Sequence, residues 1–256
     1  MLRLLLLAAF CCALLAGCHG GAKPSVEVSP KKSDNAVVAP QDSLRAKFLL
    51  TLKDAEGNTQ ELDAVLFSVP GKRYRMELTG PMGIGVASLL WTEEGWTMTF
   101  PTEKLYVKGY GYMVGLLMDN TIPLVHIHQV AGLFNGVLLP EKYEVMDDGV
   151  DIPENLMDSS LQVTYAREAT GKNFAFGKRG EEIAWLCRTG RDGKLETLKF
   201  QNFKEFEGKT LPGEIVFERD GATFLKIKMK KVAHNKSFSL GTWRLNVPRS
   251  FTQVGI

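Results

Sequence analysis

Apolar and polar residues alternate along most of the chain from Ser43 onward, and this period of two restricts the fold more than any other feature of the sequence. Residues 44–53 show it well, because leucine, alanine and phenylalanine recur there at every second position. Side chains of a β-strand point to opposite faces in turn, so such a segment is predicted to be a strand with one buried face. Further strands are predicted over residues 59–69, 73–78, 87–92, 96–100, 105–108, 161–167, 173–177, 182–189, 195–207, 213–218 and 223–232.

A segment with a different period separates two runs of strands. Residues 110–118 and 124–138 carry apolar residues three or four positions apart, the spacing typical of helices. The second predicted helix follows Pro123 and ends near Gly136. An antiparallel sheet this long must curl, and helices would bury their apolar stripe against its concave face. The predicted fold class is therefore mainly β: a curled antiparallel sheet that forms an incomplete barrel with a short helical lid.

The lid determines what the curled sheet encloses. The candidate lid residues for lining the enclosed space are Leu124, Ile127, Leu133 and Phe134, and the pattern leaves open which of Leu133 and Phe134 points inward. Inward strand positions offer leucine, methionine and aromatic side chains with few charges, a lining that suits acyl chains. Two alternatives stay open at this point, because the pattern fits both an apolar cavity and a solid core sealed by the helices.

The N-terminus is predicted to be a lipoprotein signal peptide over residues 1–17. One cation, Arg3, precedes an apolar run over residues 4–16 that is too short to span a membrane. Residues 15–18, Leu-Ala-Gly-Cys, resemble the bacterial lipobox at every position. The resemblance implies that cleavage exposes Cys18, which then carries a diacylglycerol and a further acyl chain such as palmitate, a firm anchor. The alternative is an ordinary signal peptide with a chance cysteine.

The residues after this segment bear on location and domain organisation. His19 stands where Asp commonly signals inner-membrane retention in lipoproteins, so the resemblance favours a periplasm-facing position on the outer membrane. Residues 18–42, the lipidated cysteine and a tether without aromatic residues, cannot bury enough apolar surface to fold. Residues 43–256 are expected to form one domain, long enough to enclose a core.

Charge and motifs argue against nucleic-acid binding and against catalysis. The formal net charge of +2 lacks the basic excess of a nucleic-acid-binding protein. His126 and His128 offer two metal ligands without a third, and on a helix their side chains diverge. Cys187 lies in an alternating pattern typical of a buried thiol, and the acidic residues within 141–151 are predicted to form a solvated loop. We therefore expect no enzymatic activity, no metal and no cofactor.

Residues 73–83, Arg-Tyr-Arg-Met-Glu-Leu-Thr-Gly-Pro-Met-Gly, resemble a strand and loop of LolB, the family of outer-membrane lipoproteins that receive and insert other lipoproteins. That family has an Arg-Tyr-Arg-Leu-type strand followed by an Asn/Gly-Pro-Leu-Gly loop. Further matches occur in order at residues 104–106, near Gly136, at residues 211–212 and at residues 220–221. LolB and the periplasmic carrier LolA share an incomplete antiparallel barrel, a helical lid and a hydrophobic cavity. The resemblance, over nearly all of residues 43–256, implies the same here.

The loop after the matching strand carries the most specific part of the resemblance. In LolB this loop protrudes and exposes a leucine needed for membrane insertion of cargo. Met82 occupies that place here, within a loop formed with Gly80, Pro81 and Gly83. Methionine is flexible and apolar, so it can still enter lipid. The segment beyond residue 238, which a minimal LolB does not need, indicates a divergent member.

These features imply an outer-membrane lipoprotein that binds acyl chains and takes part in lipoprotein or lipid transfer. Its expected partners are membrane lipid through acylated Cys18, acyl chains of lipoproteins or other lipids, and a periplasmic LolA-like carrier. The alternative is a non-enzymatic cell-envelope lipoprotein that uses the same fold to bind or scaffold a protein partner. A deep apolar cavity with an exposed Met82 would favour the first function, and a solid core would favour the second.

Overall fold

The alternating segments form β-strands in the computed structural model, which describes residues 43–53, 57–111, 113–114, 125–190 and 192–254. The first run comprises β1 (Leu44–Lys53), β2 (Thr59–Val69), β3 (Arg73–Thr79), β4 (Gly85–Thr92), β5 (Gly95–Phe100) and β6 (Leu105–Gly109). The second run comprises β9 (Tyr143–Met146), β10 (Gln162–Glu168), β11 (Asn173–Arg179), β12 (Glu182–Thr189), β13 (Leu195–Gln201), β16 (Glu214–Arg219) and β17 (Ala222–His234).

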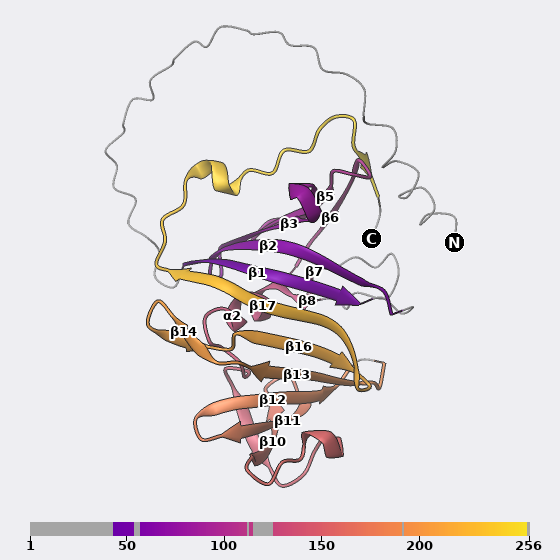
Figure 1. The fold of residues 1–256 in the computed structure, drawn as a ribbon. Coiled ribbons are helices and arrows are strands. Elements are labelled where there is room, and N and C mark those ends of the chain that lie inside the picture. Colours follow the sequence, from indigo (N-terminus) through magenta and orange to yellow (C-terminus); the bar gives the residue numbers. More distant parts are fainter. Residues whose placement is uncertain (1–42, 54–56, 112, 115–124, 191, 255–256) are drawn as a thin grey trace, which may run out of the picture. The chain divides into compact units, whose positions relative to one another are not determined.

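Both runs belong to one 14-stranded sheet, which a short terminal strand, β18 (Thr252–Gln253), completes (Figure 1). The strand order is β18-β6-β5-β4-β3-β2-β1-β17-β16-β13-β12-β11-β10-β9. The runs meet where β1 pairs with β17, with Leu44 opposite His234. The sheet curls but does not close, because β18 and β9 stay at opposite ends of the order. The predicted fold class is confirmed.

The helical insert is shorter than its periodicity predicts. The helix α2 spans only Ile127–Leu133, and a short strand, β8 (Val125–His126), precedes it and pairs with β7 (Met113–Val114). The predicted helix over 124–138 is therefore wrong at both ends, and the described part of the predicted helix over 110–118 contains β7 instead. Residues after α2 keep the apolar spacing because they continue to face the same core, with no helix needed.

The C-terminal stop of α2 follows helix-capping chemistry. Gly136 takes the left-handed conformation at φ 84°. Its amide donates to the carbonyl of Leu133, and the Val137 amide donates to the carbonyl of Gly132. This pair of bonds is the Schellman arrangement, in which glycine is favoured because it has no Cβ. The sequence signal at Gly136 thus marked the end of the helical segment correctly.

Two stretches of the second run also differ from expectation. The predicted strand over residues 195–207 breaks at Asn202, whose φ is 56°, and continues as a hairpin of β14 (Lys204–Phe206) and β15 (Lys209–Leu211). The acidic stretch over residues 141–151, predicted to be a loop, contributes β9 at one edge of the sheet. A strand as short as β9 has too few residues to show the alternation of apolar and polar side chains.

Residues 235–254, here called the C-terminal strap, lie against the sheet face opposite the core. They include the 3-10 turn η4 (Leu240–Trp243) and end in β18, which pairs in parallel with β6. The Phe238 ring meets the Phe67 ring edge-on at 5.6 Å, and the guanidinium of Arg73 lies 4.7 Å from the Trp243 ring centroid. Arg75 Nη1 donates to the carbonyls of residues 242 and 244 at 2.9 and 2.6 Å. The strap therefore covers both an outer face and a sheet edge.

Candidate functional site

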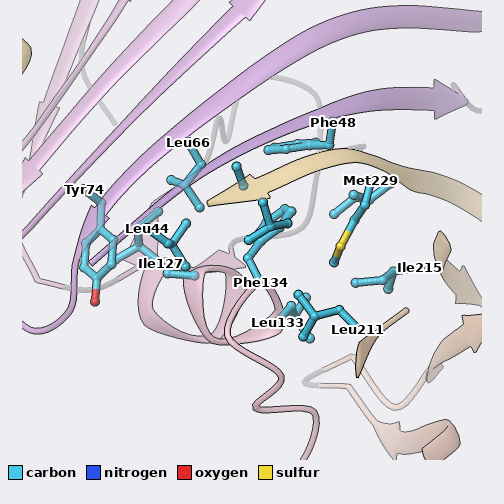
Figure 2. Packing of buried hydrophobic residues seen from close by; sticks show 14 of the residues in the cluster. Leu44, Phe48, Leu66, Tyr74, Ile127, Leu133, Phe134, Leu211, Ile215 and Met229 are labelled. Atoms are coloured by element: carbon cyan, nitrogen blue, oxygen red, sulfur yellow. The ribbon is translucent and has the colours of Figure 1, made fainter. Parts of the chain in front are cut away.

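The concave face of the sheet carries the main hydrophobic core, and α2 packs into it. Ile127, Leu133 and Phe134 are 1, 6 and 0% exposed. Figure 2 shows Phe134 at the centre of the cluster, and its ring centroid lies 4.8 Å from that of Phe48 on β1. Burial of each such side chain contributes about 1.5–3 kcal/mol. This part of the concave face is filled by the protein's own residues.

Three of the four lid residues predicted from the sequence lie in this core. Leu133 and Phe134, which the sequence left undecided, both face inward, Leu133 toward Leu211 and Phe134 among the residues of β1 and β17 (Figure 2). Ile127 lies in the same cluster. Leu124 lies outside the described residues. The structure brings three of the four together as core.

A separate pocket of about 590 Å³ opens beside this core. Its lining comes from the chain after α2, the β11–β12 turn and the β13–β15 region: Gly136, Val137, Leu138, Leu139, Glu181, Glu182, Ile183, Phe203 and Thr210. Leu138, Leu139 and Phe203 are partly buried and pack against the main core. The volume falls within the range of small-molecule sites. An apolar floor with polar groups at the edge suits one end of an amphiphile.

Sequence reasoning missed this pocket. Its residues come from segments nearly 75 positions apart, and no periodicity links them. Gly136, Val137 and Leu138 fell within the predicted helix, and Glu182, Ile183 and Phe203 fell within predicted strands, but none of these patterns pointed to a shared pocket. The signal that joins them is the break at Asn202, because the hairpin it starts places Phe203 and Thr210 beside the chain after α2.

The loop between β3 and β4 holds the predicted membrane-insertion residues on the surface. It forms a 3-10 turn, η2 (Pro81–Gly83), closed by the Gly80 amide donating to the Ile84 carbonyl at 2.8 Å. Met82 is 92% exposed and has φ 59°, and Ile84, not singled out before, is 54% exposed. Pro81 and Gly83 are exposed and Gly80 is half-buried. The loop therefore presents two apolar side chains on a fixed backbone.

The His128 side chain is enclosed between aromatic rings. His128 on α2 lies with its ring centroid 5.1 Å from Tyr74 and 5.2 Å from Trp91. The Tyr74 hydroxyl accepts from the Gly71 amide at 3.0 Å, and the Trp91 indole donates to the Gly111 carbonyl at 2.7 Å. His126 belongs to β8, not to a helix as predicted. These contacts give His128 a packing role at the start of the helix.

The one cysteine of the described residues is buried on β12. Cys187 is 0% exposed, and burial raises the pKa of its thiol to about 11, offset in part by a hydrogen bond with Thr197. A thiol with a raised pKa is a poor nucleophile near neutral pH. Across the described segments, no group of three or more His, Cys, Asp or Glu residues is placed to hold a metal ion.

No helix among the residues that the structure describes has the length and apolar character needed to cross a membrane. The predicted anchor, Cys18, lies outside the described residues, as does the whole tether over residues 18–42.

Comparison with known proteins rests on structure alone. No protein-family model and no curated protein matches the sequence. An outer membrane lipoprotein-sorting protein domain from Vibrio parahaemolyticus matches with TM-score 0.51 and 11% identity, covering 79% of this chain and 89% of that one. A LolA superfamily protein from Nitrosomonas europaea matches with TM-score 0.52 and 13% identity, covering 82% and 99%. A DUF1329 family protein from Desulfovibrio piger matches with TM-score 0.50 and 10% identity, covering 80% and 90%.

These likenesses extend over most of both chains in each pair, so they concern the whole described domain and not a shared hairpin. Two of the three proteins are described as a lipoprotein-sorting domain or a LolA superfamily member. At this level of identity the likeness is one of architecture. The chain therefore shares its fold with a LolA superfamily protein and with a lipoprotein-sorting protein domain.

Proposed function

We propose that this protein is an outer-membrane lipoprotein, anchored through acylated Cys18 and facing the periplasm, that binds acyl chains and takes part in lipid or lipoprotein transfer. The observation that carries the proposal is the partly apolar pocket beside the α2 core on a LolA-like sheet. The pocket offers Leu138, Leu139 and Ile183 to an alkyl chain, and transfer of each buried methylene from water contributes about 0.8 kcal/mol. No enzymatic step is assigned to the protein.

The exposed loop supports a LolB-like variant of this function. Met82 and Ile84 stand on the β3–β4 turn without burial, and each can enter the acyl region of a membrane. A single methionine contributes about 1.5–3 kcal/mol on burial, enough for a transient contact and too little for permanent attachment. A periplasmic LolA-like carrier is the proposed source of cargo.

Lipid extraction from the purified protein, followed by mass spectrometry, tests the proposal. The unmutated protein is expected to retain lipids with acyl chains. Leu139→Glu places a carboxylate on the apolar floor, where an unpaired charge is costly, and should reduce the retained lipid several-fold. Leu240→Glu is the matched control, because Leu240 is 74% exposed and lies outside the pocket.

A second function follows from the filled concave face. Because α2 and Phe134 occupy the region next to β1 and β17, the fold also suits a lipoprotein that binds a protein partner on its surface. An absence of bound lipid in both the unmutated protein and the Leu240→Glu control would favour this second function and overturn the first.

A further inference from the structure

The pocket beside α2 differs sharply in charge between its floor and its rim. Leu138, Leu139, Ile183 and Phe203 make the floor apolar. The charged residues that line it are Glu181 and Glu182, at the β11–β12 turn, and the Glu181 side chain is fully exposed. Thr210 completes the rim, and its partner across the β14–β15 hairpin is a third acidic residue, Glu205. The two carboxylates that line the pocket thus come from adjacent residues of one turn, next to the apolar lining residues.

None of the described residues that line the pocket is a lysine or arginine, and one of its two glutamates pairs with a neighbouring lysine. Lys178 Nζ lies 3.7 Å from Glu181 Oε2, and the Arg179 guanidinium lies 3.1 Å from the Asp158 carboxylate. Glu182 has no ion pair with any residue that the structure describes. The rim therefore presents negative charge that the neighbouring side chains only partly offset.

We propose that this pocket selects an alkyl chain that carries a cationic head group, a primary ammonium being the simplest case. The inference rests on the proposed acyl-binding function and adds a preference for a cationic head group over a neutral or anionic one. The alkyl chain lies against Leu139, Ile183 and Phe203, and the ammonium sits at the rim beside Glu182. A free carboxylate at the same place would face like charges, which disfavour binding.

The size of the preference follows from the exposure of the rim. Ion pairs between exposed groups are weak, and two glutamates act here. We expect dodecylammonium to bind about three- to thirtyfold more tightly than dodecanoate, with dodecanol between them. Because exposed charges are screened, the ratio should shrink toward one at about 0.5 M salt, while dodecanol binding should not weaken.

Titration calorimetry with dodecylammonium, dodecanol and dodecanoate, on the chain carrying Cys18→Ala to remove the lipid anchor, tests the inference. Glu181→Gln with Glu182→Gln should abolish the preference, so that the three compounds bind with similar affinities. The matched control is Glu93→Gln with Glu94→Gln, which removes two adjacent carboxylates from the β4–β5 turn and should keep the preference.

The outcomes separate the two proposals. Equal affinity for all three compounds, or a preference that survives in Glu181→Gln/Glu182→Gln, overturns the head-group inference and leaves the acyl-binding function standing. No binding of any of the three compounds overturns both. Binding that persists unchanged in Leu139→Glu shows that the compounds occupy another site and also overturns the inference.

Discussion

Met82 stands in a backbone conformation that glycine would adopt more easily. Its φ of 59° is left-handed, a region that costs an L-residue with a side chain about 1 kcal/mol. The flanking Gly83 has φ 78° and meets no such cost. A bulky apolar side chain at a strained, 92% exposed position adds nothing to the core. The Met82 side chain therefore does not stabilise the fold, which agrees with the proposed contact with lipid.

The first prediction separates the two roles of this residue. Met82→Gly should raise the free energy of unfolding by about 0.5–1 kcal/mol, because strain is relieved, but it should slow hand-over of bound lipid to liposomes. Met82→Glu should slow the hand-over further without loss of lipid uptake. Met82→Leu should preserve it. Stability is read from urea unfolding and transfer from a fluorescent-lipid assay.

The control for Met82 is Leu240→Glu, at another exposed position outside the loop. This variant should transfer lipid at the unmutated rate. If Met82→Glu and the unmutated protein transfer at equal rates, the loop takes no part in the process.

Cys187 gives a second prediction at this scale. Burial raises the pKa of its thiol from 9.0 to about 11, so the folded protein keeps a proton that the unfolded chain loses above pH 9. The neutral thiol therefore supports folding fully below pH 9, and this contribution is lost as the pH rises from 9 through 11. The loss is on the order of 2 kcal/mol.

Urea unfolding measured between pH 8 and about 11 checks this pH dependence. In Cys187→Ala, the decline in unfolding free energy over that range should be smaller than in the unmutated protein, whatever the starting stability. Reaction of the thiol with a disulfide reagent at pH 8 should be slow in the folded state and fast in denaturant. Parallel pH profiles for the two proteins would contradict the assignment.

At the scale of elements, Arg75 connects β3 to the C-terminal strap. Its side chain is 16% exposed, donates to two strap carbonyls and forms an ion pair with Glu77 at 2.7 Å. Arg75→Ala should therefore release the strap locally. Trypsin cleavage at Arg244 should become roughly tenfold faster or more, because charge-assisted hydrogen bonds of this kind are among the stronger ones.

Arg167→Ala is the matched control for the strap, since Arg167 pairs with Glu144 at 3.5 Å at the other end of the sheet. Its cleavage rate at Arg244 should equal that of the unmutated protein. Equal rates in Arg75→Ala and Arg167→Ala would show that the strap is held by its aromatic contacts and not by the guanidinium.

The elements differ in how far the sequence determines them. Strands such as β1 and β4 were predictable because one face of each is buried and the period is long enough to detect. The ends of α2 could not be predicted, because the residues after the helix face the core from a turn and have the same apolar spacing as a helix. The strap follows no period because its contacts are single aromatic and guanidinium pairs. The Met82 turn was predictable from glycine and proline, whereas the pocket depends on segments that meet only after folding.

On the scale of the whole molecule, the lipid anchor is predicted to be the sole attachment to the membrane. Cys18→Ala should leave the protein in the soluble periplasmic fraction, because the substitution removes the thiol that would carry the acyl chains. Cell fractionation and immunoblotting measure this, with the unmutated protein in the outer-membrane fraction as reference. Recovery of the Cys18→Ala protein in the membrane pellet would reveal a second attachment.

The pairing of β1 with β17 has a consequence for the order of folding. Leu44 meets His234, and the Ser43 hydroxyl donates to the Lys236 carbonyl, so the first strand waits for almost the last part of the chain. During synthesis, β1 to β6 can form hairpins early, while the outer edge of β1 stays unpaired. Such long sequence separation slows folding. The edge of β1 that β17 covers therefore stays unpaired until nearly the whole chain has been made. During that time this edge is open to pairing with a wrong strand.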